Sequence, residues 1–340
     1  MVKVQEEAKE QGVQVPRASP KFEEFGIPVM GRMTDSNERL LIFERRQESS
    51  MPQVRLGESR KGEMVKPLLI SFSGGRTSAF MTKFLKERYP DRNIHIVFAN
   101  TGKEREETLE FVDECDRRWN LGIVWIESVI HPEKGIGVSF KVVNFETAAR
   151  NGEPFESMLS KHGIPNQAFP FCSRELKQYP INKYIRSLGY KDWDIAIGIR
   201  ADEEHRVNRK TAKAERKIFP LVDDIRVDAE FIRNFWDKQC FDLKLKDYQG
   251  NCDLCWKKSD RKLMTMVVEE PKRLDWWRQM EKKYGKGEFV FFREKKSADA
   301  LMEKSKQPFE PAIDQHELNK KQPQFDFMMD KEEACVCKST

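Results

Sequence analysis

Residues 67–78, PLLISFSGGRTS, decide the fold of this chain. An apolar run typical of a buried strand ends in the turn Ser73-Gly74-Gly75, and apolar residues then recur at helical spacing as far as Tyr89. The stretch therefore predicts a strand, a glycine loop and a helix. Glycines after a strand let backbone N–H groups converge on phosphate oxygens in front of the helix N-terminus, and Ser73 and Ser78 add hydroxyl donors. An ordinary tight turn is the alternative for a Ser-Gly-Gly sequence taken alone.

The sequence beyond this stretch repeats the alternation of strand and helix. Apolar runs at 94–99, 121–126 and 195–199 are typical of buried strands, and helical spacing of apolar residues separates the first two. Beyond about residue 222, aromatic residues at helical spacing replace the strand pattern. We therefore expect an α/β fold, in which a parallel twisted sheet has helices on both faces and binds ligands at the carboxyl ends of its strands. The expected parts are an extension and linker at 1–66, the sheet domain with the glycine loop at 67–222, a mainly helical region with a Cys-x-x-Cys motif at 223–294, and a mobile tail at 295–340.

Composition narrows the class of protein. With 340 residues, of which 39% are hydrophobic and 34% charged, the chain can bury a core and is too apolar for a wholly disordered protein. A net charge of +5 does not by itself indicate a polyanionic partner. No apolar stretch has the length of a signal peptide's hydrophobic region or of a membrane span, so we expect a cytoplasmic protein with no membrane partner. The sequence does not indicate the oligomeric state.

The spacing of the cysteines indicates metal or redox chemistry. The chain has 7 cysteines, and thiols in the expected compartment are kept reduced. Cys252 and Cys255 form a Cys-x-x-Cys motif in which one metal can bind both thiolates. Cys172 lies immediately before a basic motif, and Cys335 and Cys337 form a Cys-x-Cys near residue 340. Inert buried thiols are the alternative.

Several motifs in one order resemble the phosphoadenosine phosphosulfate (PAPS) reductase family, in particular the branch common in phages and bacteria. This family belongs to the adenine nucleotide alpha-hydrolase superfamily, whose members bind pyrophosphate with a PP-loop. The resemblance covers about residues 67 to 280, and several motifs together are more specific than any single one. The motifs are the glycine loop, NTGKE at 100–104, TLEFV at 108–112, RNGEPF at 150–155, FCSRELK at 171–177, GIRADE at 198–203 and GNCDLCW at 250–256.

The resemblance implies that an adenine nucleotide, ATP or adenylyl sulfate, binds across the strand ends, with Mg²⁺ as an optional companion. Arg174 and Lys177 are then expected to act as catalytic anion clamps, since a guanidinium binds phosphate or sulfate oxygens through two parallel hydrogen bonds. Solvated surface charge is the alternative, most of all for Arg206 and for the basic run that follows it as far as Lys217, which could instead form a nucleic-acid track. The nucleotide-binding residues that the resemblance implies are Ser71, Ser73, Gly74, Gly75, Arg76, Thr77, Ser78, Asn100, Thr101, Gly102, Gly198, Arg200 and Arg206.

The resemblance also implies a 4Fe–4S cluster, with ligands at Cys172, Cys252 and Cys255. Family members that carry the cluster have a tandem Cys-Cys before the Cys-x-x-Cys, whereas Phe171 occupies one tandem position here. Either one iron is open or the fourth ligand is another cysteine, for which the candidates are Cys240, Cys335 and Cys337. Zinc is the alternative metal, because thiolates suit it equally well.

The leading interpretation is a sulfonucleotide reductase. The thiolate of Cys335 or Cys337 would attack the sulfur of adenylyl sulfate, and a dithiol reductant such as thioredoxin would then release sulfite. The reductases of the family end in Glu-Cys-Gly-x-His, whereas no histidine follows these cysteines. A cluster ligand and an inert tail therefore remain alternatives for the two thiols.

Two other functions stay open at this point. An ATP-dependent sulfurtransferase would adenylate a nucleic-acid base or another acceptor, release pyrophosphate, and let sulfur held at the cluster displace AMP. A non-enzymatic nucleotide sensor or nucleic-acid-binding module is the third interpretation, which the missing tandem cysteine and the basic run from Arg206 to Lys217 favour.

Overall fold

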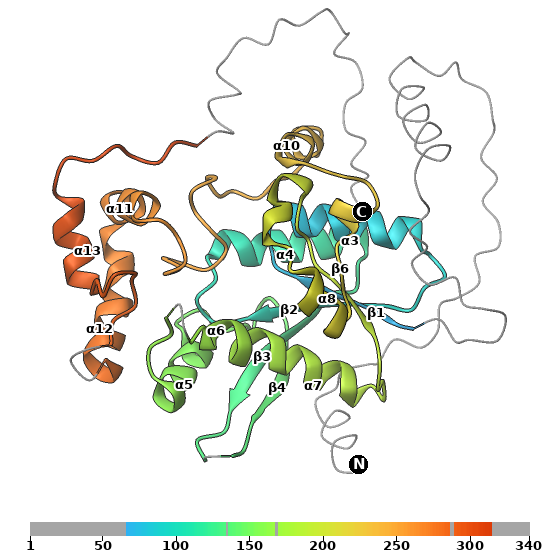
Figure 1. Ribbon diagram of the computed structural model, residues 1–340, viewed down its shortest axis with the longest axis horizontal. Coiled ribbons are helices and arrows are strands. Elements are labelled where there is room, and N and C mark those ends of the chain that lie inside the picture. Colours follow the sequence, from blue (N-terminus) through green and yellow to red (C-terminus); the bar gives the residue numbers. More distant parts are fainter. Residues whose placement is uncertain (1–65, 134, 167–168, 286–288, 315–340) are drawn as a thin grey trace, which may run out of the picture. The chain divides into compact units, whose positions relative to one another are not determined.

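The centre of the structure is a mostly parallel β-sheet (Figure 1). The computed structural model describes residues 66–133, 135–166, 169–285 and 289–314. The six strands found there have the order β4-β3-β2-β1-β5-β6, and all neighbours are parallel except β3 and β4. The predicted α/β fold is therefore confirmed, with an antiparallel edge strand that the sequence did not reveal. The strands are β1 (Leu68–Phe72), β2 (Ile94–Asn100), β3 (Val124–Ile130), β4 (Val138–Val143), β5 (Asp194–Ala196) and β6 (Lys217–Ile218).

Strand β1 lies between β2 and β5 and is apolar on both faces of the sheet. Its side chains alternate between two cores, since successive side chains of a strand point to opposite faces. Leu68, Ile70 and Phe72 belong to one core, and Leu69 belongs to the other. Such a strand is stable only when helices cover both faces, which is the arrangement predicted from the sequence.

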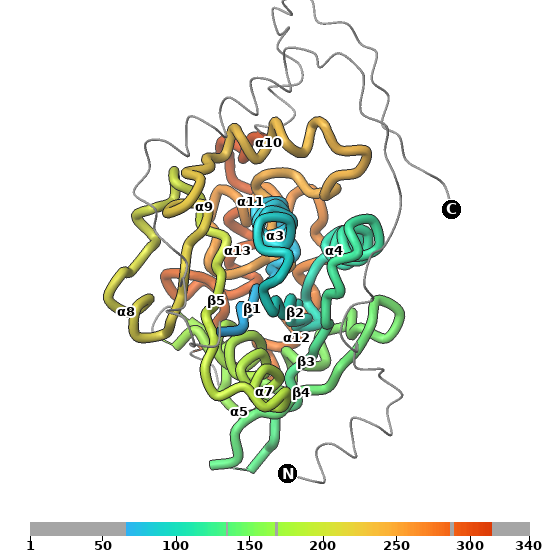
Figure 2. Tube along the Cα trace, turned by 90° about the vertical axis from the view of Figure 1, so that its right-hand side faces the viewer, coloured from blue at the N-terminus to red at the C-terminus, as the bar shows by residue number. Residues whose placement is uncertain are grey.

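Helices on each face bury these two cores (Figure 2). The first face is covered by α3 (Arg76–Arg88), α4 (Glu106–Trp119) and α10 (Ala229–Asp237), and α7 (Tyr179–Ser187) covers the opposite face. Trp236 of α10 is 1% exposed and stands 5.0 Å from the ring of a phenylalanine on α4. The region after residue 222 therefore contributes directly to the core of the sheet.

A second group of helices forms its own hydrophobic core. The helix that follows the edge strand β4 of the sheet also contributes to this core. The helices α11 (Asp260–Glu269), α12 (Leu274–Tyr284) and α13 (Ala298–Ser305) pack with α5 (Glu153–His162). The expected tail from residue 295 thus begins with a packed helix, because Leu301 is fully buried against this group. The extension at 1–65 and the Cys-x-Cys of the expected tail lie outside the described residues.

Short elements connect these layers. They are α6 (Phe171–Ser173), a π-helical turn η1 (Arg174–Gln178), the 3-10 turns η2 (Ala201–Arg206) and η3 (Pro271–Arg273), α8 (Arg209–Ala214) and α9 (Pro220–Asp223).

Among the residues that the structure describes, no helix has both the length and the apolar character needed to cross a membrane.

Candidate functional site

The glycine loop between β1 and α3 is shaped for an anion. Gly74 has a φ of +78°, and a Cβ atom there would lie 2.6 Å from Cγ2 of Thr108, so both conformation and space require glycine. The backbone N–H of Ser73 donates to Oγ of Ser78 at 3.0 Å, which closes the loop. Gly75 is the N-cap of α3 and has no side chain to offer the N–H groups of the first turn. These groups and the helix dipole therefore remain available for phosphate.

The loop opens into a cavity of about 490 Å³ with a positive lining. Five Lys or Arg residues and two Asp or Glu residues line it. Arg200 donates to Asp202 at 2.9 Å and 3.0 Å, and Arg206 donates to Glu203 at 2.6 Å. Since these ion pairs are partly exposed to solvent, each contributes little stability, and a phosphate group can displace the carboxylates. The expected nucleotide-binding residues that line this cavity are Ser73, Gly75, Arg76, Thr77, Ser78, Gly198, Arg200 and Arg206.

A second cavity of about 720 Å³ adjoins the first. Ser71, at the carboxyl end of β1, and Lys177 line it, and Arg206 lines both cavities. Apolar side chains of β1 and of the β5 strand region form its floor. The two cavities together place anion-binding groups next to an apolar wall, which is the usual composition of a nucleotide site.

The Cys-x-x-Cys segment is joined to the glycine loop by hydrogen bonds. The side-chain amide of Asn251 donates to the backbone carbonyl of Ser73 at 2.7 Å. Beside it, the backbone N–H of Arg105 donates to the carbonyl of Asn251, and the N–H of Asp253 donates to the carbonyl of Lys103, both at 2.7 Å. The Cys-x-x-Cys segment therefore forms a short antiparallel bridge with residues 103–105 and lies directly beside the glycine loop.

Three thiols gather at this bridge. The thiol of Cys252 donates a hydrogen bond to Cys255, which raises the pKa of Cys252 and lowers the pKa of Cys255 to about 6. Burial raises the pKa of Cys172, and the nearby positive charges of Lys257 and Lys177 oppose the effect. Cys172 also interacts electrostatically with Cys255. At neutral pH, Cys255 is therefore the thiol of the three that carries negative charge.

Lys177 faces both the thiols and a buried carboxylate. Its ammonium donates to Glu104 Oε1 at 2.9 Å, and the other oxygen of Glu104 accepts the backbone N–H of Thr101 at 2.9 Å. Burial lowers the pKa of Lys177, but the negative charge of Glu104 and the hydrogen bond to it outweigh burial, and the net result is a raised pKa. Lys177 is therefore a permanent cation between the thiols and the larger cavity.

The described residues do not complete a metal site. Among residues 66–314, as far as they are described, no three His, Cys, Asp or Glu side chains are arranged to hold a metal ion. Cys240 is not the missing ligand, because its sulfur accepts from Arg118 near the end of α4. Cys252 pairs with Glu104, before the start of the same helix. At 1.5 Å per residue, this separates the two cysteines by about 20 Å. The metal set of Cys172, Cys252 and Cys255 therefore stays a prediction.

Several expected nucleotide ligands have structural roles instead. Asn100 is fully buried, and its amide donates to Glu127 at 2.7 Å and to the carbonyl of Ala149 at 2.9 Å. Neither of the two cavities is lined by Asn100, Thr101 or Gly102, and the contacts of Asn100 organise the loop after β2.

One expected nucleotide-binding residue and one expected anion clamp are paired with carboxylates. The guanidinium of Arg76 donates to both oxygens of Asp242 at 2.7 Å and 2.9 Å, so its charge is already paired at the edge of the cavity. Arg174 donates to Glu175 at 2.8 Å and lines neither cavity. Sequence patterns located both residues but could not show which partners their side chains would find.

Other residues of the site carry no motif in the sequence. Arg233 of α10 and Lys246 line the cavity of about 490 Å³, and both lie between the motifs at 198–203 and 250–256. Asn251 and Glu104 lie inside the motifs GNCDLCW and NTGKE. Their positions close to Cys252 and Gly102 could have identified them as site residues.

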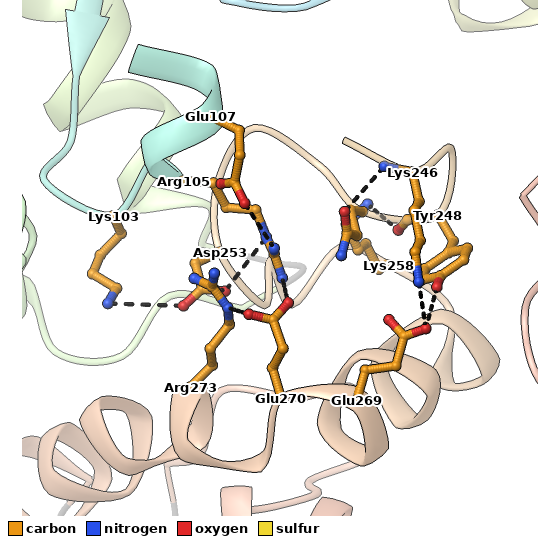
Figure 3. A network of polar contacts seen from close by, with 11 residues as sticks. Lys103, Arg105, Glu107, Lys246, Tyr248, Asp253, Lys258, Glu269, Glu270 and Arg273 are labelled. Carbon is orange, nitrogen blue, oxygen red and sulfur yellow. Dashed lines mark hydrogen bonds and ion pairs between the residues drawn. The ribbon is translucent and has the colours of Figure 1, made fainter. Parts of the chain in front are cut away.

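A buried charge network holds the Cys-x-x-Cys segment on its other side (Figure 3). Arg105 is 2% exposed, donates to Glu270 at 2.8 Å and lies 3.9 Å from Asp253. Arg273 lies 3.7 Å from Asp253 as well. The network joins the residues before α4 to the turn between α11 and α12, and so fixes the cysteine segment between the sheet and the helical group.

Known proteins share this sequence pattern. The phosphoadenosine phosphosulfate reductase domain matches residues 67–223. The nin region protein ORF290 of Escherichia phage lambda, described as uncharacterized, is 34% identical over 207 residues, which are 59% of this chain and 70% of that protein. The chain belongs to the phosphoadenosine phosphosulfate reductase family. Membership supports a nucleotide-binding role at the level of the family.

Two archaeal relatives extend the range of the family. Two uncharacterized proteins of Methanocaldococcus jannaschii are 30% and 25% identical over 149 and 162 residues. The matches span 44% and 45% of this chain but only 25% and 32% of those proteins. The similarity to this PAPS reductase family member therefore covers part of two longer chains.

Proposed function

We propose that the protein is an enzyme that binds a sulfonucleotide at the glycine loop and reduces it to sulfite. The observation that carries this proposal is the 2.7 Å hydrogen bond from Asn251 to Ser73, which connects the Cys-x-x-Cys segment to the phosphate loop. The charged Lys177 between thiols and cavity supports it, since a cation there stabilises negative charge on sulfate oxygens during attack. Sulfur chemistry and nucleotide binding thus share one location.

The proposed reaction uses two thiol steps. The thiolate of Cys335 or Cys337 attacks the sulfur of adenylyl sulfate, the S–O bond to the phosphate breaks, and AMP leaves with the electron pair. A dithiol protein such as thioredoxin then attacks the S-sulfocysteine, which releases sulfite and leaves the donor as a disulfide. A 4Fe–4S cluster or zinc bound by Cys172, Cys252 and Cys255 remains part of the proposal.

The test is sulfite release by full-length protein purified without oxygen. We expect release from adenylyl sulfate or its 3′-phosphorylated form with thioredoxin as reductant, and at least a hundredfold loss in the double variant Cys335→Ser, Cys337→Ser. The control is Cys240→Ser, since Cys240 lies against Arg118, away from the site, and should keep its rate. Undiminished release by the double variant would remove these thiols from the mechanism.

Two further measurements on the same preparation separate the alternatives. Iron, sulfide and zinc are counted directly, and fewer than one equivalent of each would contradict a resident metal. Pyrophosphate formation from ATP in the presence of nucleic acid, without any sulfite release, would replace the reductase with a sulfurtransferase.

A further inference from the structure

A stacked group of partly exposed aromatic side chains lies beside the larger cavity. Phe169 is 58% exposed, and its ring stacks on Phe171 at 5.8 Å and 12°. Phe171 in turn stacks on His162 at 5.1 Å. The guanidinium of Arg174 lies 5.1 Å from the ring centre of Phe171 and 5.7 Å from that of Tyr179, which is 44% exposed. We call these five residues the aromatic ladder.

The ladder has the chemistry of a base-stacking platform. Exposed apolar rings that stand next to one another are unusual on a soluble surface and mark a binding site. Flat rings and a guanidinium plane are the groups on which unpaired nucleic-acid bases stack. The proposed sulfonucleotide reaction uses none of the four rings.

A basic groove continues from the ladder. Tyr179 lines the cavity of about 720 Å³, so the ladder borders the cavity through this residue. Six Lys or Arg residues but only two Asp or Glu residues line this cavity, which gives it a local charge far above the chain average. Their ion pairs lie mostly at the surface and are weak enough for phosphates to displace. The basic residues are Lys177, Arg186, Lys191, Arg206, Arg216 and Lys217.

The length of the groove argues for a polymer. Its lining runs along the β5 strand region from Trp193 to Ile199, which at about 3.3 Å per residue is about 20 Å. Stacked nucleotides follow one another at about 3.4 Å in a strand, so about six of them match this length. A mononucleotide spans only part of this length.

We propose that the ladder and the groove bind a single strand of nucleic acid, with its phosphates along the basic wall and unpaired bases on the ladder. A double helix does not fit this chemistry, because its bases hide their π-faces from the protein. The proposal does not rest on the sulfonucleotide reaction, since Phe169, Lys191 and Lys217 take no part in that reaction.

The test is fluorescence anisotropy with the full-length protein and labelled single-stranded 20-mers of dT and of U. We expect both to bind at 50 mM salt, with log affinity falling linearly with log salt concentration. The double variant Phe169→Ala, Tyr179→Ala removes two stacking rings and should weaken binding at least tenfold. The double variant Lys191→Glu, Lys217→Glu should weaken binding by a similar factor and flatten the salt dependence.

Matched controls lie on the opposite face of the sheet. Phe231 on α10 is 40% exposed, and the side chain of Arg117 on α4 is 66% exposed. Phe231→Ala and Arg117→Glu should change binding less than twofold. Absence of binding by both oligonucleotides at 50 mM salt, or equal weakening by ladder and control variants, would overturn the proposal.

Nucleotide binding separates this proposal from the previous one. Phe169→Ala should retain the ATP affinity of the unmodified protein, because Phe169 lines neither cavity. Loss of both ATP and oligonucleotide binding in this variant would overturn the assignment of a separate surface. Oligonucleotide binding without any sulfite release would reject only the proposed reaction.

Discussion

At the scale of single residues, Gly74 carries the strictest requirement of the phosphate loop. Alanine there would have to keep a φ of +78° and would bring Cβ to 2.6 Å from Thr108. We expect Gly74→Ala to lower the free energy of unfolding by about 2–3 kcal/mol and to abolish nucleotide binding. Gly122 is the matched control, since it has a φ of +72° with nothing within 4 Å, and its alanine variant should lose only about 1 kcal/mol. Urea denaturation measures the free energy of unfolding of both variants. Equal losses of stability would show that Thr108 moves to make room for the added Cβ atom.

Asn251 tests the connection between the cysteine segment and the phosphate loop. Asn251→Ala removes the hydrogen bond to Ser73 and should cost about 1 kcal/mol of stability. Because the loop also loses its support, we expect ATP or adenylyl sulfate to bind at least threefold more weakly in calorimetry. Asn93→Ala removes a surface hydrogen bond to Tyr190 and should leave nucleotide affinity unchanged. An unchanged affinity in Asn251→Ala would mean that the loop holds its shape alone.

At the scale of elements, helix α9 ends at an aspartate whose burial disfavours the charged form of its carboxyl group. Asp224 is its C-cap, and Oδ2 of Asp224 is among the buried atoms without a hydrogen-bond partner in the described residues. Burial, together with the negative charge of Asp223, raises the pKa of Asp224 to about 6. The folded state therefore binds a proton that the unfolded state has released between about pH 4 and pH 6, and stability falls as pH rises through this window. Asp224→Asn should raise the melting temperature at pH 8 and leave it nearly unchanged at pH 4.

The control for this prediction is the neighbouring acid. Asp223 accepts from Arg209 at 2.7 Å and 2.8 Å, so Asp223→Asn should not stabilise the protein at either pH. Equal melting temperatures of Asp224→Asn and the unmodified protein at pH 8 would contradict the raised pKa.

Elements with a strong local pattern could be predicted, and those that depend on distant partners could not. The strands β1 and β2 and the helices α3 and α4 follow from apolar periodicity, which reports burial. Strand β4 alternates weakly and exists because β3 offers an antiparallel partner. The eight-residue α13 is half polar and packs because α11 and α12 provide a surface for Leu301.

The same distinction explains which residues of the candidate site could be predicted from the sequence. Residue types and their order located the glycine loop and the Cys-x-x-Cys, because backbone chemistry and family motifs are local in sequence. The partners of Asn100 come from Glu127 and Ala149, and the partner of Arg76 is Asp242, 166 residues away. Side chains that satisfy such distant groups are indistinguishable in sequence from side chains that face a ligand.

At the scale of the whole molecule, neither the sheet nor the helical group is complete alone. Trp236, beyond the matched domain, fills the core over β1, and α5 supplies Phe155 and Leu159 to the core of the helical group. The Arg105 network joins the two through Asp253 and Glu270. Shared cores of this kind make the described residues 66–314 one cooperative unit.

We therefore expect β1 and α12 to lose hydrogen-exchange protection at the same urea concentration. Arg105→Met would leave Glu270 and Asp253 without their buried cation, which should lower stability by about 3 kcal/mol. Because the unit is cooperative, the midpoints of β1 and α12 should shift together. The control Arg117→Glu removes an exposed pair with Asp113 and should shift neither midpoint measurably. Two outcomes would contradict a single cooperative unit: loss of protection in α12 at lower urea than in β1, or a shift of the α12 midpoint alone in Arg105→Met. The cysteine segment would then lie on a hinge between two independent units. Its position beside the glycine loop would vary as α12 unfolds.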